Sequence, residues 1–393
     1  MIPYGRQNIN QADIDAVIDV LRSDFLTQGP VVPAFENAVA KYCGTQHAVA
    51  VNSATSALHI ACLALGVGHG DTVWTSPITF VASANCALYC GAKVDFVDID
   101  PNTYNLSVDR LKEKLEQAQQ TGNVPKVVIP VHLCGQSCDM AGIYALSQHY
   151  GFKIIEDASH AIGGRYKDEP IGNCRFSDIT VFSFHPVKII TTGEGGIALT
   201  NDNQSAKRMQ LLRSHGITSD KADLSPRPKE ELWNYQQIYL GYNYRMTDIQ
   251  AALGLSQMQR LNDFVSKRHT IATRYNQMLS ALPVVQPWQH PDSYSSFHLY
   301  VIRLKLDEIS KTHREVYEML RAAGVLVNLH YIPVYRQPYY EQMGFSAGYC
   351  AEAEQYYSEA ISLPMYPGLT EQQQDYVVSA LENALSGQGR RDS

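Results

Sequence analysis

Short apolar segments alternate with helical segments through residues 48–156 of this chain. The apolar segments have the length and β-branched content of buried strands, and they lie at residues 48–52, 72–75, 93–98, 126–132 and 153–156. Helical patterns follow them at residues 54–65, 81–89, 108–119 and 140–150. Repeated strand–helix units favour an α/β fold with a mostly parallel sheet and helices on both faces. In such sheets, ligands bind beyond the carboxyl ends of the strands.

The 393-residue chain is too long for one hydrophobic core, so we expect two domains. The alternation stops near residues 259–270, which predicts an N-terminal arm and a large domain over residues 1–260. Residues 261–393 would form a smaller α+β domain, ending in a disordered tail at residues 387–393. Asn10 and Thr247 are placed to cap helices, and the helix after Thr247 would continue through residue 261 and beyond.

Charge and composition exclude several classes of partner. The net charge is −7 and no long basic run is present, so nucleic acid and anionic membranes are poor candidates. The first ten residues lack the apolar core of a signal peptide, and no run of eighteen apolar residues occurs, so we expect a cytoplasmic protein. The eight cysteines are scattered without a Cys-x-x-Cys pair, which favours reduced thiols. We expect no metal site, because the histidines are dispersed as well.

Lys188 lies between two predicted buried strands, at residues 179–184 and 196–200. Apolar side chains flank it, and a glycine-rich turn follows at residues 193–196. Apolar surroundings disfavour an ammonium ion, so we expect a lowered pKa and an available free amine. Such an amine can form a Schiff base with a carbonyl cofactor. On the local sequence alone, an exposed lysine in a hairpin loop is the alternative.

Two further candidate sites follow strands of the same predicted sheet. Ser53 begins a small-residue turn into a helix, where unpaired N–H groups and the hydroxyls of Thr55 and Ser56 can bind phosphate. Simple N-capping by Ser53 would also explain that turn. Asp157 ends another strand, and a buried carboxylate needs a cationic or protonated partner. A protonated ring nitrogen would serve, unless Asp157 only caps a helix.

These segments together resemble the DegT/DnrJ family of pyridoxal-phosphate (PLP) sugar aminotransferases. The resemblance covers nearly the whole chain, and the order and spacing of its pieces make it specific. The matching pieces are residues 52–58, 77–80, 156–163, 183–188 (Ser-Phe-His-Pro-Val-Lys), 193–196 (Gly-Glu-Gly-Gly) and 241–245 (Gly-Tyr-Asn-Tyr-Arg). The resemblance implies the fold type I of PLP-dependent transferases with a sheet of the seven-stranded type. It also implies pyridoxal 5′-phosphate as cofactor, pyridoxamine phosphate (PMP) as its intermediate form, and a homodimer with shared active sites.

The same resemblance implies roles for individual residues. Lys188 would bind the cofactor and later move the proton between the amino donor and the cofactor. Asp157 would pair with the pyridinium nitrogen and Phe80 would lie against the ring, while His160 would lie near the ring hydroxyl. The phosphate would be held by Thr55, Ser56 and Ser183, and by Asn243 reaching over from the partner subunit.

A related group in this family performs sugar dehydration and has histidine at the lysine position, so Lys188 favours transamination. The likeness within the family favours transfer of an amino group from L-glutamate to C4 of a UDP-linked 4-keto-6-deoxy-N-acetylhexosamine. By that likeness, the nucleotide sugar would contact Tyr4, Asp24, Phe25, Leu26, Thr27, Ser56, Asn243, His330, Tyr331, Ile332 and Pro333. Ile189 follows the lysine where relatives often have Asn or Pro, so the sugar substrate is less defined than the chemistry.

Three other functions fit parts of the sequence. A 3-aminotransferase acting on a dTDP-linked ketosugar would share every cofactor residue, and only substrate tests separate it from the first assignment. A non-catalytic relative that senses cofactor or sugar would not need both Lys188 and Asp157. A nucleotide-dependent dehydrogenase lacks support, because no Gly-x-Gly-x-x-Gly motif follows a first strand. Arg245 is a candidate for binding the side-chain carboxylate of glutamate, or equally for the dimer interface.

Overall fold

A seven-stranded sheet forms the centre of the molecule. The computed structural model describes residues 1–226, 231 and 233–386, and within them the sheet order is β2-β10-β9-β6-β5-β3-β4. The strands are β2 (His47–Val51), β3 (Thr72–Thr75), β4 (Lys93–Phe96), β5 (Val127–Ile129), β6 (Lys153–Asp157), β9 (Ile179–Ser183) and β10 (Gly196–Thr200). β10 runs antiparallel to both of its neighbours, and the remaining pairs are parallel. The predicted α/β class with a mostly parallel sheet is therefore confirmed.

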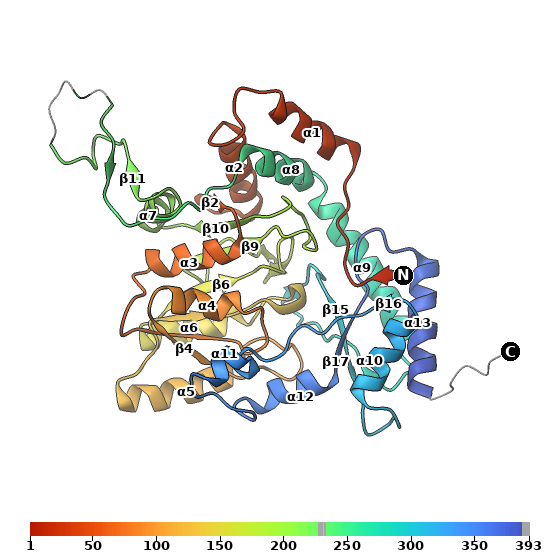
Figure 1. The fold of residues 1–393 in the computed structure, drawn as a ribbon. Helices are drawn as coiled ribbons and strands as arrows, with labels where there is room; N and C mark the ends of the chain where they lie inside the picture. Colours follow the sequence, from red (N-terminus) through yellow and green to blue (C-terminus); the bar gives the residue numbers. More distant parts are fainter. Residues whose placement is uncertain (227–230, 232, 387–393) are drawn as a thin grey trace.

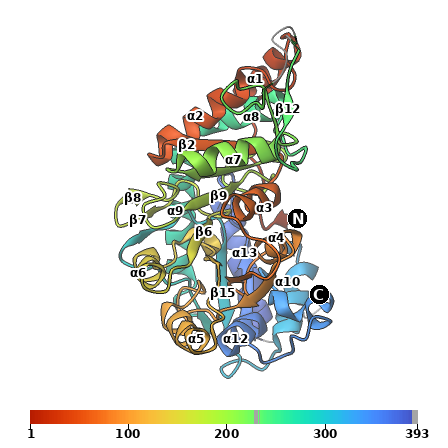
Figure 2. The same cartoon turned by 90° about the vertical axis from the view of Figure 1, so that its left-hand side faces the viewer.

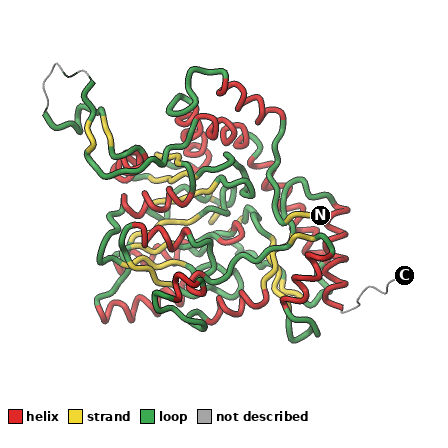
Figure 3. Tube along the Cα trace, viewed as in Figure 1, coloured by secondary structure: helices red, strands yellow, loops and turns green. Residues whose placement is uncertain are grey.

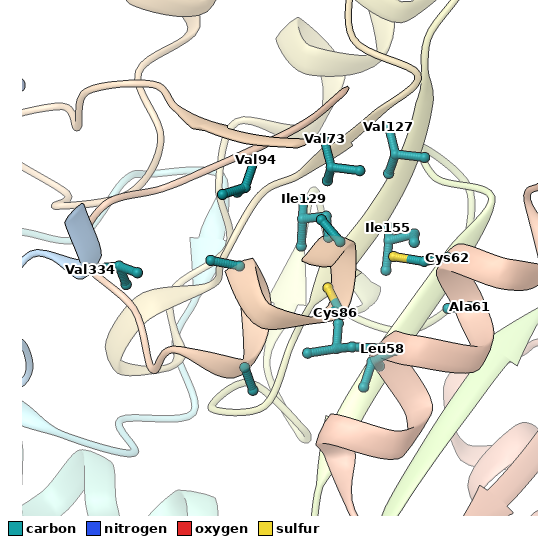
Figure 4. Close-up of a cluster of buried hydrophobic side chains, with 14 of the residues drawn as sticks. Leu58, Ala61, Cys62, Val73, Cys86, Val94, Val127, Ile129, Ile155 and Val334 are labelled. Carbon is teal, nitrogen blue, oxygen red and sulfur yellow. The ribbon is translucent and has the colours of Figure 1, made fainter. Parts of the chain in front are cut away.

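Helices cover both faces of this sheet, as Figures 1 and 2 show. The helices are α3 (Ala54–Ala64) and α4 (Ala82–Tyr89) on one face, with α5 (Val108–Thr121) and α6 (Met140–Tyr150) on the other. β5 illustrates the alternation: Val127 and Ile129 pack with Leu58 of α3 and Cys86 of α4 (Figure 4), whereas Val128 packs toward α5 and α6. Successive strand side chains point to opposite faces, so both faces of the sheet are buried.

A group of helices lies at the β2 edge of the sheet, at the top of Figure 1. It contains α1 (Gln11–Leu21), α2 (Val31–Cys43) and α8 (Asp248–Met258), while α7 (Asn203–Arg213) packs on β2 and α3. The predicted caps are correct, because Asn10 and Thr247 each form a capping box. Asp248 is fully buried and accepts hydrogen bonds from the N–H groups of Gly29, Val31 and Val32 at 3.1–3.3 Å. One carboxylate thus holds α8 against the start of α2.

The prediction of one long helix through residue 261 is wrong. α8 ends at Met258, and α9 (Leu261–Met278) starts after a break at Gln259 and Arg260. Both residues form tight turns, with their N–H groups bonded to Ser256 O and Gln257 O. The Arg260 guanidinium forms an ion pair with the buried Asp13 and bonds Asn8 Oδ1 at 2.7 Å. This distant contact with the N-terminal segment explains a break that no local proline or glycine marks.

The C-terminal part has a hydrophobic core of its own. A three-stranded sheet of β13 (Val284–Val285), β15 (Tyr300–Leu304) and β17 (Ala360–Leu363) packs with α9, α10 (His313–Ala322) and α13 (Glu371–Ser386). In Figure 3 these elements lie at the right of the molecule, beside the N-terminus. β1 (Ile2–Pro3) pairs in parallel with β16 (Val325–Leu326), so the N-terminal arm joins this part. A domain boundary at residue 260 stays a prediction, and the predicted tail at 387–393 lies outside the described residues.

Shorter elements complete the described chain. They are β7 (Arg165–Tyr166), β8 (Glu169–Pro170), β11 (Ile217–Thr218), β12 (Gln236–Gln237), β14 (Ser293–Tyr294), α11 (Pro338–Glu341) and α12 (Ala351–Glu359), with single 3-10 turns at Leu133–Gly135 and Val334–Arg336. The eight cysteines, all within the described ranges, are free thiols, as the sequence predicts. Within those same ranges, no helix is both long enough and apolar enough to cross a membrane.

Replacing Asp248 by alanine is expected to lower the free energy of unfolding by about 2 kcal/mol, because buried N–H groups at the start of α2 lose their acceptor. Urea unfolding followed by circular dichroism measures this. Asp248→Asn is the matched control, since it keeps one acceptor oxygen and should lose less stability. Equal unfolding curves for wild type and Asp248→Ala would show that the carboxylate does not hold these helices together.

Candidate active site

Four strands end at one edge of the central sheet and deliver polar residues there. Ser53 follows β2, Ser76 follows β3, Asp157 ends β6 and Ser183 ends β9. β10 returns antiparallel between β2 and β9, with Gly196 opposite both Val51 and Ser183. A Cβ atom on Gly196 would lie 2.4 Å from the backbone nitrogen of Ala54, so only glycine allows α3 to approach this closely. The turn at Ser53 and the loop carrying Lys188 are thereby held side by side.

The start of α3 presents unpaired hydrogen-bond donors. Ser53 caps the helix by accepting the N–H of Ser56 at 3.1 Å, and Ser56 Oγ donates to Asn52 Oδ1 at 2.7 Å. Among the described residues, the backbone N–H groups of Ala54 and Thr55 have no acceptor. Because the helix dipole adds positive potential at this end, the turn can bind an anion as well as being capped by Ser53.

Lys188 lies in the loop between β9 and β10 and is partly buried. The N-terminal arm passes close by, since a Cβ atom on Gly5 would lie 3.6 Å from Val187 Cβ. Burial lowers the pKa of the Lys188 amine to about 8, while the Asp157 carboxylate opposes part of that shift. The change has the direction that the sequence predicts, and it leaves a larger share of free amine near neutral pH than an exposed lysine has.

Asp157 is buried, and hydrogen bonds orient both of its carboxylate oxygens. Ser83 Oγ donates to Oδ2 at 2.6 Å, and Ser159 donates to Oδ1 through its hydroxyl at 2.5 Å and its N–H at 3.1 Å. Residues 158–163, all of them described, form turns, so the alternative that Asp157 caps a helix is wrong. The carboxylate is instead fixed at the strand end, with Lys188 as the nearby basic group.

His160 is a neutral imidazole whose two nitrogens are both engaged. Nδ1 accepts the N–H of Cys134 at 3.3 Å, so the ring proton lies on Nε2, which faces the Tyr331 hydroxyl at 3.3 Å. Burial, together with the charge of Lys188, lowers the pKa of His160 well below its usual value. Its ring centroid lies 4.4 Å from that of His298. The site therefore holds a hydrogen-bonded imidazole without an added positive charge.

The structure brings most of the predicted residues together. Phe80, 60% exposed, lies 6.4 Å from Tyr331 between ring centroids, and the rings of Tyr4 and His330 lie 5.1 Å apart. Ile332 is exposed at the same loop, whereas Pro333 is buried beneath it. Ser183 lies opposite Gly196, and Thr55 and Ser56 directly follow Ala54, which Gly196 approaches.

Two predicted groups form their hydrogen bonds with other parts of the described chain. Residues 24–27 lie at the start of α8. Leu26 O accepts the N–H of Asp248 at 3.0 Å, and Thr27 forms an isolated antiparallel β-bridge with Thr247. Phe25 and Leu26 are about half exposed there. Asn243 is exposed as well, and its carbonyl oxygen lies 3.5 Å from Asn52 Nδ2. In the described part of the chain, no hydrogen bond or ion pair joins any of these residues to Lys188, Asp157 or His160.

Several residues of the site were not predicted from the sequence. Ser159 follows Asp157 by two positions, a spacing at which an aspartate commonly bonds the backbone ahead of it, so a local signal existed. Ser83 and Cys134 carry no such signal, because they reach Asp157 and His160 from other elements. His298 lies 138 positions from His160 in the sequence, and only the fold brings them together.

Comparisons with known proteins identify the family of this chain. Residues 7–382 match the family described as DegT/DnrJ/EryC1/StrS aminotransferases. The chain is 38% identical over 389 residues to the spore coat polysaccharide biosynthesis protein SpsC of Bacillus subtilis, covering 98% of this chain and 97% of that protein. It is 37% identical over 386 residues to a UDP-4-amino-4,6-dideoxy-N-acetyl-β-L-altrosamine transaminase of Campylobacter jejuni, covering 98% of each.

A solved structure is similar over the whole chain. Helicobacter pylori PseC, described as an aminotransferase involved in the biosynthesis of pseudoaminic acid, superposes with a TM-score of 0.89 at 30% sequence identity. The superposition covers 98% of this chain and 100% of that one. The small C-terminal elements are therefore shared with PseC as well as the central sheet.

In protein freed of any carbonyl cofactor, the acetylation rate of Lys188 should rise with pH around a midpoint near 8, because only the free amine reacts. Competitive acetylation read by mass spectrometry measures this, with a free lysine derivative in the same solution as the reference for ordinary reactivity. Asp157→Asn should move the Lys188 midpoint to lower pH, since it removes the charge that stabilises the ammonium. A midpoint at the ordinary lysine value of about 10.4 would contradict the assigned environment.

Proposed function

The chain belongs to the DegT/DnrJ/EryC1/StrS aminotransferase family, and we propose that it moves the amino group of L-glutamate to C4 of a UDP-linked 4-keto-6-deoxy-N-acetylhexosamine. Members of this family are PLP-dependent sugar aminotransferases. The observation that carries the proposal is Lys188, with its lowered pKa, beside the oriented carboxylate of Asp157. The Campylobacter relative supports the UDP-sugar and the product UDP-4-amino-4,6-dideoxy-N-acetyl-β-L-altrosamine, and the Helicobacter PseC structure supports a place in pseudaminic acid biosynthesis.

The residues present fit PLP. Its phosphate matches the unpaired N–H groups at the start of α3 and the hydroxyls of Thr55, Ser56 and Ser183. Asp157 would accept a hydrogen bond from the protonated ring nitrogen, and Phe80 is exposed enough to lie against a ring. When bound, PLP supplies an electron sink for the negative charge that develops at the carbon carrying the amine.

The chain's own groups divide the remaining work. Lys188 Nζ is the group placed to take and return a proton at the reacting carbon, because its lowered pKa makes the free amine accessible. Ser83 and Ser159 hold the Asp157 carboxylate in one orientation, so it need not reorganise during the reaction. Tyr4, His330 and Tyr331 form the aromatic side of the site, which we assign to the nucleotide sugar together with Ile332 and Pro333.

We also infer a homodimer with shared sites. The described residues around β11 and β12 (217–226 and 233–240) project from the body at the upper left of Figure 1 and expose large apolar side chains, namely Trp233, Tyr235, Tyr239 and Leu240. Contiguous exposed apolar surface is typical of a protein interface. Asn243, next to this segment, and residues 24–27 form no hydrogen bond or ion pair with Lys188 among the described residues of their own chain. Delivery of these residues to a neighbouring subunit's site accounts for both observations.

The purified protein should show a yellow absorbance band that is lost on adding L-glutamate alone, because the donor converts the cofactor to its amine form. The band should return with a UDP-linked 4-ketosugar as amino acceptor. Return only with a dTDP-linked 3-ketosugar would move the assignment to a 3-aminotransferase. A protein that stays colourless after incubation with PLP would contradict the role given to Lys188.

Shared sites predict complementation between inactive variants. A mixture of Lys188→Ala and Asn243→Asp chains, unfolded and refolded together, should recover about a quarter of wild-type activity, since half of randomly mixed dimers carry one intact site of two. Lys188→Ala mixed with Asp157→Asn is the control and should recover none, because both lesions lie in the same chain's site. Recovery in neither mixture would place Asn243 in its own chain's site.

A further inference from the structure

Three imidazole rings, His160, His298 and His330, lie around Lys188. All three are buried, and the charge of Lys188 contributes to lowering the pKa of each. Two of the rings have both nitrogens engaged. His160 meets the Cys134 N–H and the Tyr331 hydroxyl, and His330 meets Ser362 Oγ at 2.8 Å and Asn328 Nδ2 at 3.3 Å. These two rings are therefore held by the protein itself.

His298 differs from the other two. Nδ1 is sealed from solvent and has no hydrogen-bond partner among the described residues. Nε2 has no hydrogen-bond partner in that part of the chain either, but unlike Nδ1 it is not fully buried. A buried polar atom without a partner costs roughly 1–3 kcal/mol. A phenyl ring would fill the same space without the cost of the unpartnered Nδ1, so an imidazole at this position is explained only if its other nitrogen, Nε2, binds a partner from outside the chain.

The backbone that carries His298 is fixed from two sides. Arg268 of α9 is fully buried, and its Nη1 lies 3.0–3.1 Å from the carbonyl oxygens of Phe297, His298 and Met365. On the other side, Ser296 Oγ donates to His160 O at 2.7 Å. A Cβ atom on Gly135 would lie 2.4 Å from that same Ser296 Oγ, so this junction admits only glycine. The ring is thus held rigidly against His160 while its nitrogens stay uncommitted.

We propose that His298 is a ligand-binding residue of this site, and that its Nε2 hydrogen-bonds an anionic oxygen of the bound ligands. Two sources supply such an oxygen: the carboxylate of the amino donor, and the ring oxygen of PLP. In the second case His298 shares with His160 the position assigned near that oxygen. A bond from His298 to the donor carboxylate rests on the proposed function. A bond from His298 to the ring oxygen of PLP rests only on membership of the family.

Electrostatics favours this assignment. Burial and the neighbouring positive groups, Lys188 and Arg268, lower the pKa of His298, so the ring is neutral before a ligand arrives. His160 and His330 also face the ring and act in the same direction. A neutral imidazole with a free N–H can donate to an anion without first losing another partner, and hydrogen bonds to charged groups are the stronger ones.

The test compares His298→Phe and His298→Gln with wild type in the holoenzyme. Three quantities are measured: PLP retention on dilution, the pH titration of the absorbance band, and the dependence of band loss on L-glutamate concentration. If the donor carboxylate is the partner, His298→Phe should weaken the apparent affinity for L-glutamate by about tenfold or more, with an unchanged band titration. If the ring oxygen is the partner, the band titration and PLP retention should shift instead. His298→Gln should recover part of either loss.

His269→Phe is the matched control. His269 bonds Ser295 O at 2.7 Å and stacks on Tyr294, so it supports the same segment without reaching the site. It should lose thermal stability while the three measured quantities stay at wild-type values. Unchanged PLP retention, band titration and glutamate dependence in His298→Phe would overturn the proposal. If L-glutamate leaves the wild-type absorbance band unchanged, glutamate is not the amino donor and the proposed function fails. PLP retention and the band titration of His298→Phe would still test whether His298 binds the ring oxygen of PLP.

Discussion

The antiparallel pairing of β10 with β2 and β9 is the constraint on which the site depends. Gly196 lies opposite both Val51 at the end of β2 and Ser183 at the end of β9. The turn at Ser53 and the loop that carries Lys188 therefore begin two strand spacings apart, roughly 10 Å. A register slip of one residue would turn every β10 side chain to the other face. It would also remove the glycine contact with Ala54, and α3 could no longer lie close to the Lys188 loop.

Around this frame the site balances opposing electrostatic effects. Burial lowers the pKa of Lys188, while the carboxylate of Asp157 holds it from falling further. Ser83 and Ser159 donate hydrogen bonds to the Asp157 carboxylate, so it is buried with partners other than the Lys188 amine. Burial also lowers the pKa of the surrounding imidazoles, so these rings are neutral. An incoming anionic cofactor therefore meets hydrogen-bond donors and a reactive amine instead of a cluster of fixed positive charges.

The two halves of the chain meet at this site. The central sheet supplies the residues at its carboxyl edge, and the C-terminal part supplies His298, His330 and Tyr331 from the loops around β15 and β16. Arg268 ties the segment before β15 to the segment after β17 by binding carbonyl oxygens at both 297–298 and 365. The N-terminal arm closes the arrangement by pairing with β16 and placing Tyr4 beside His330. A ligand bound there touches segments that span almost the whole sequence.

The sequence by itself determined the order of strands and helices, the parallel character of the sheet and the candidacy of Lys188 and Asp157. Each of these follows from neighbours along the chain: β-branched runs, helical periodicity, capping residues, and an ionisable group at the end of an apolar strand. Only the tertiary structure decided the break between α8 and α9, the serine that orients Asp157 from α4, and the placement of His298 against His160. Arg260 meets Asp13 across 247 positions and Ser83 meets Asp157 across 74. Such contacts depend on how whole helices and strands pack against one another, which the residues on either side of each position do not determine.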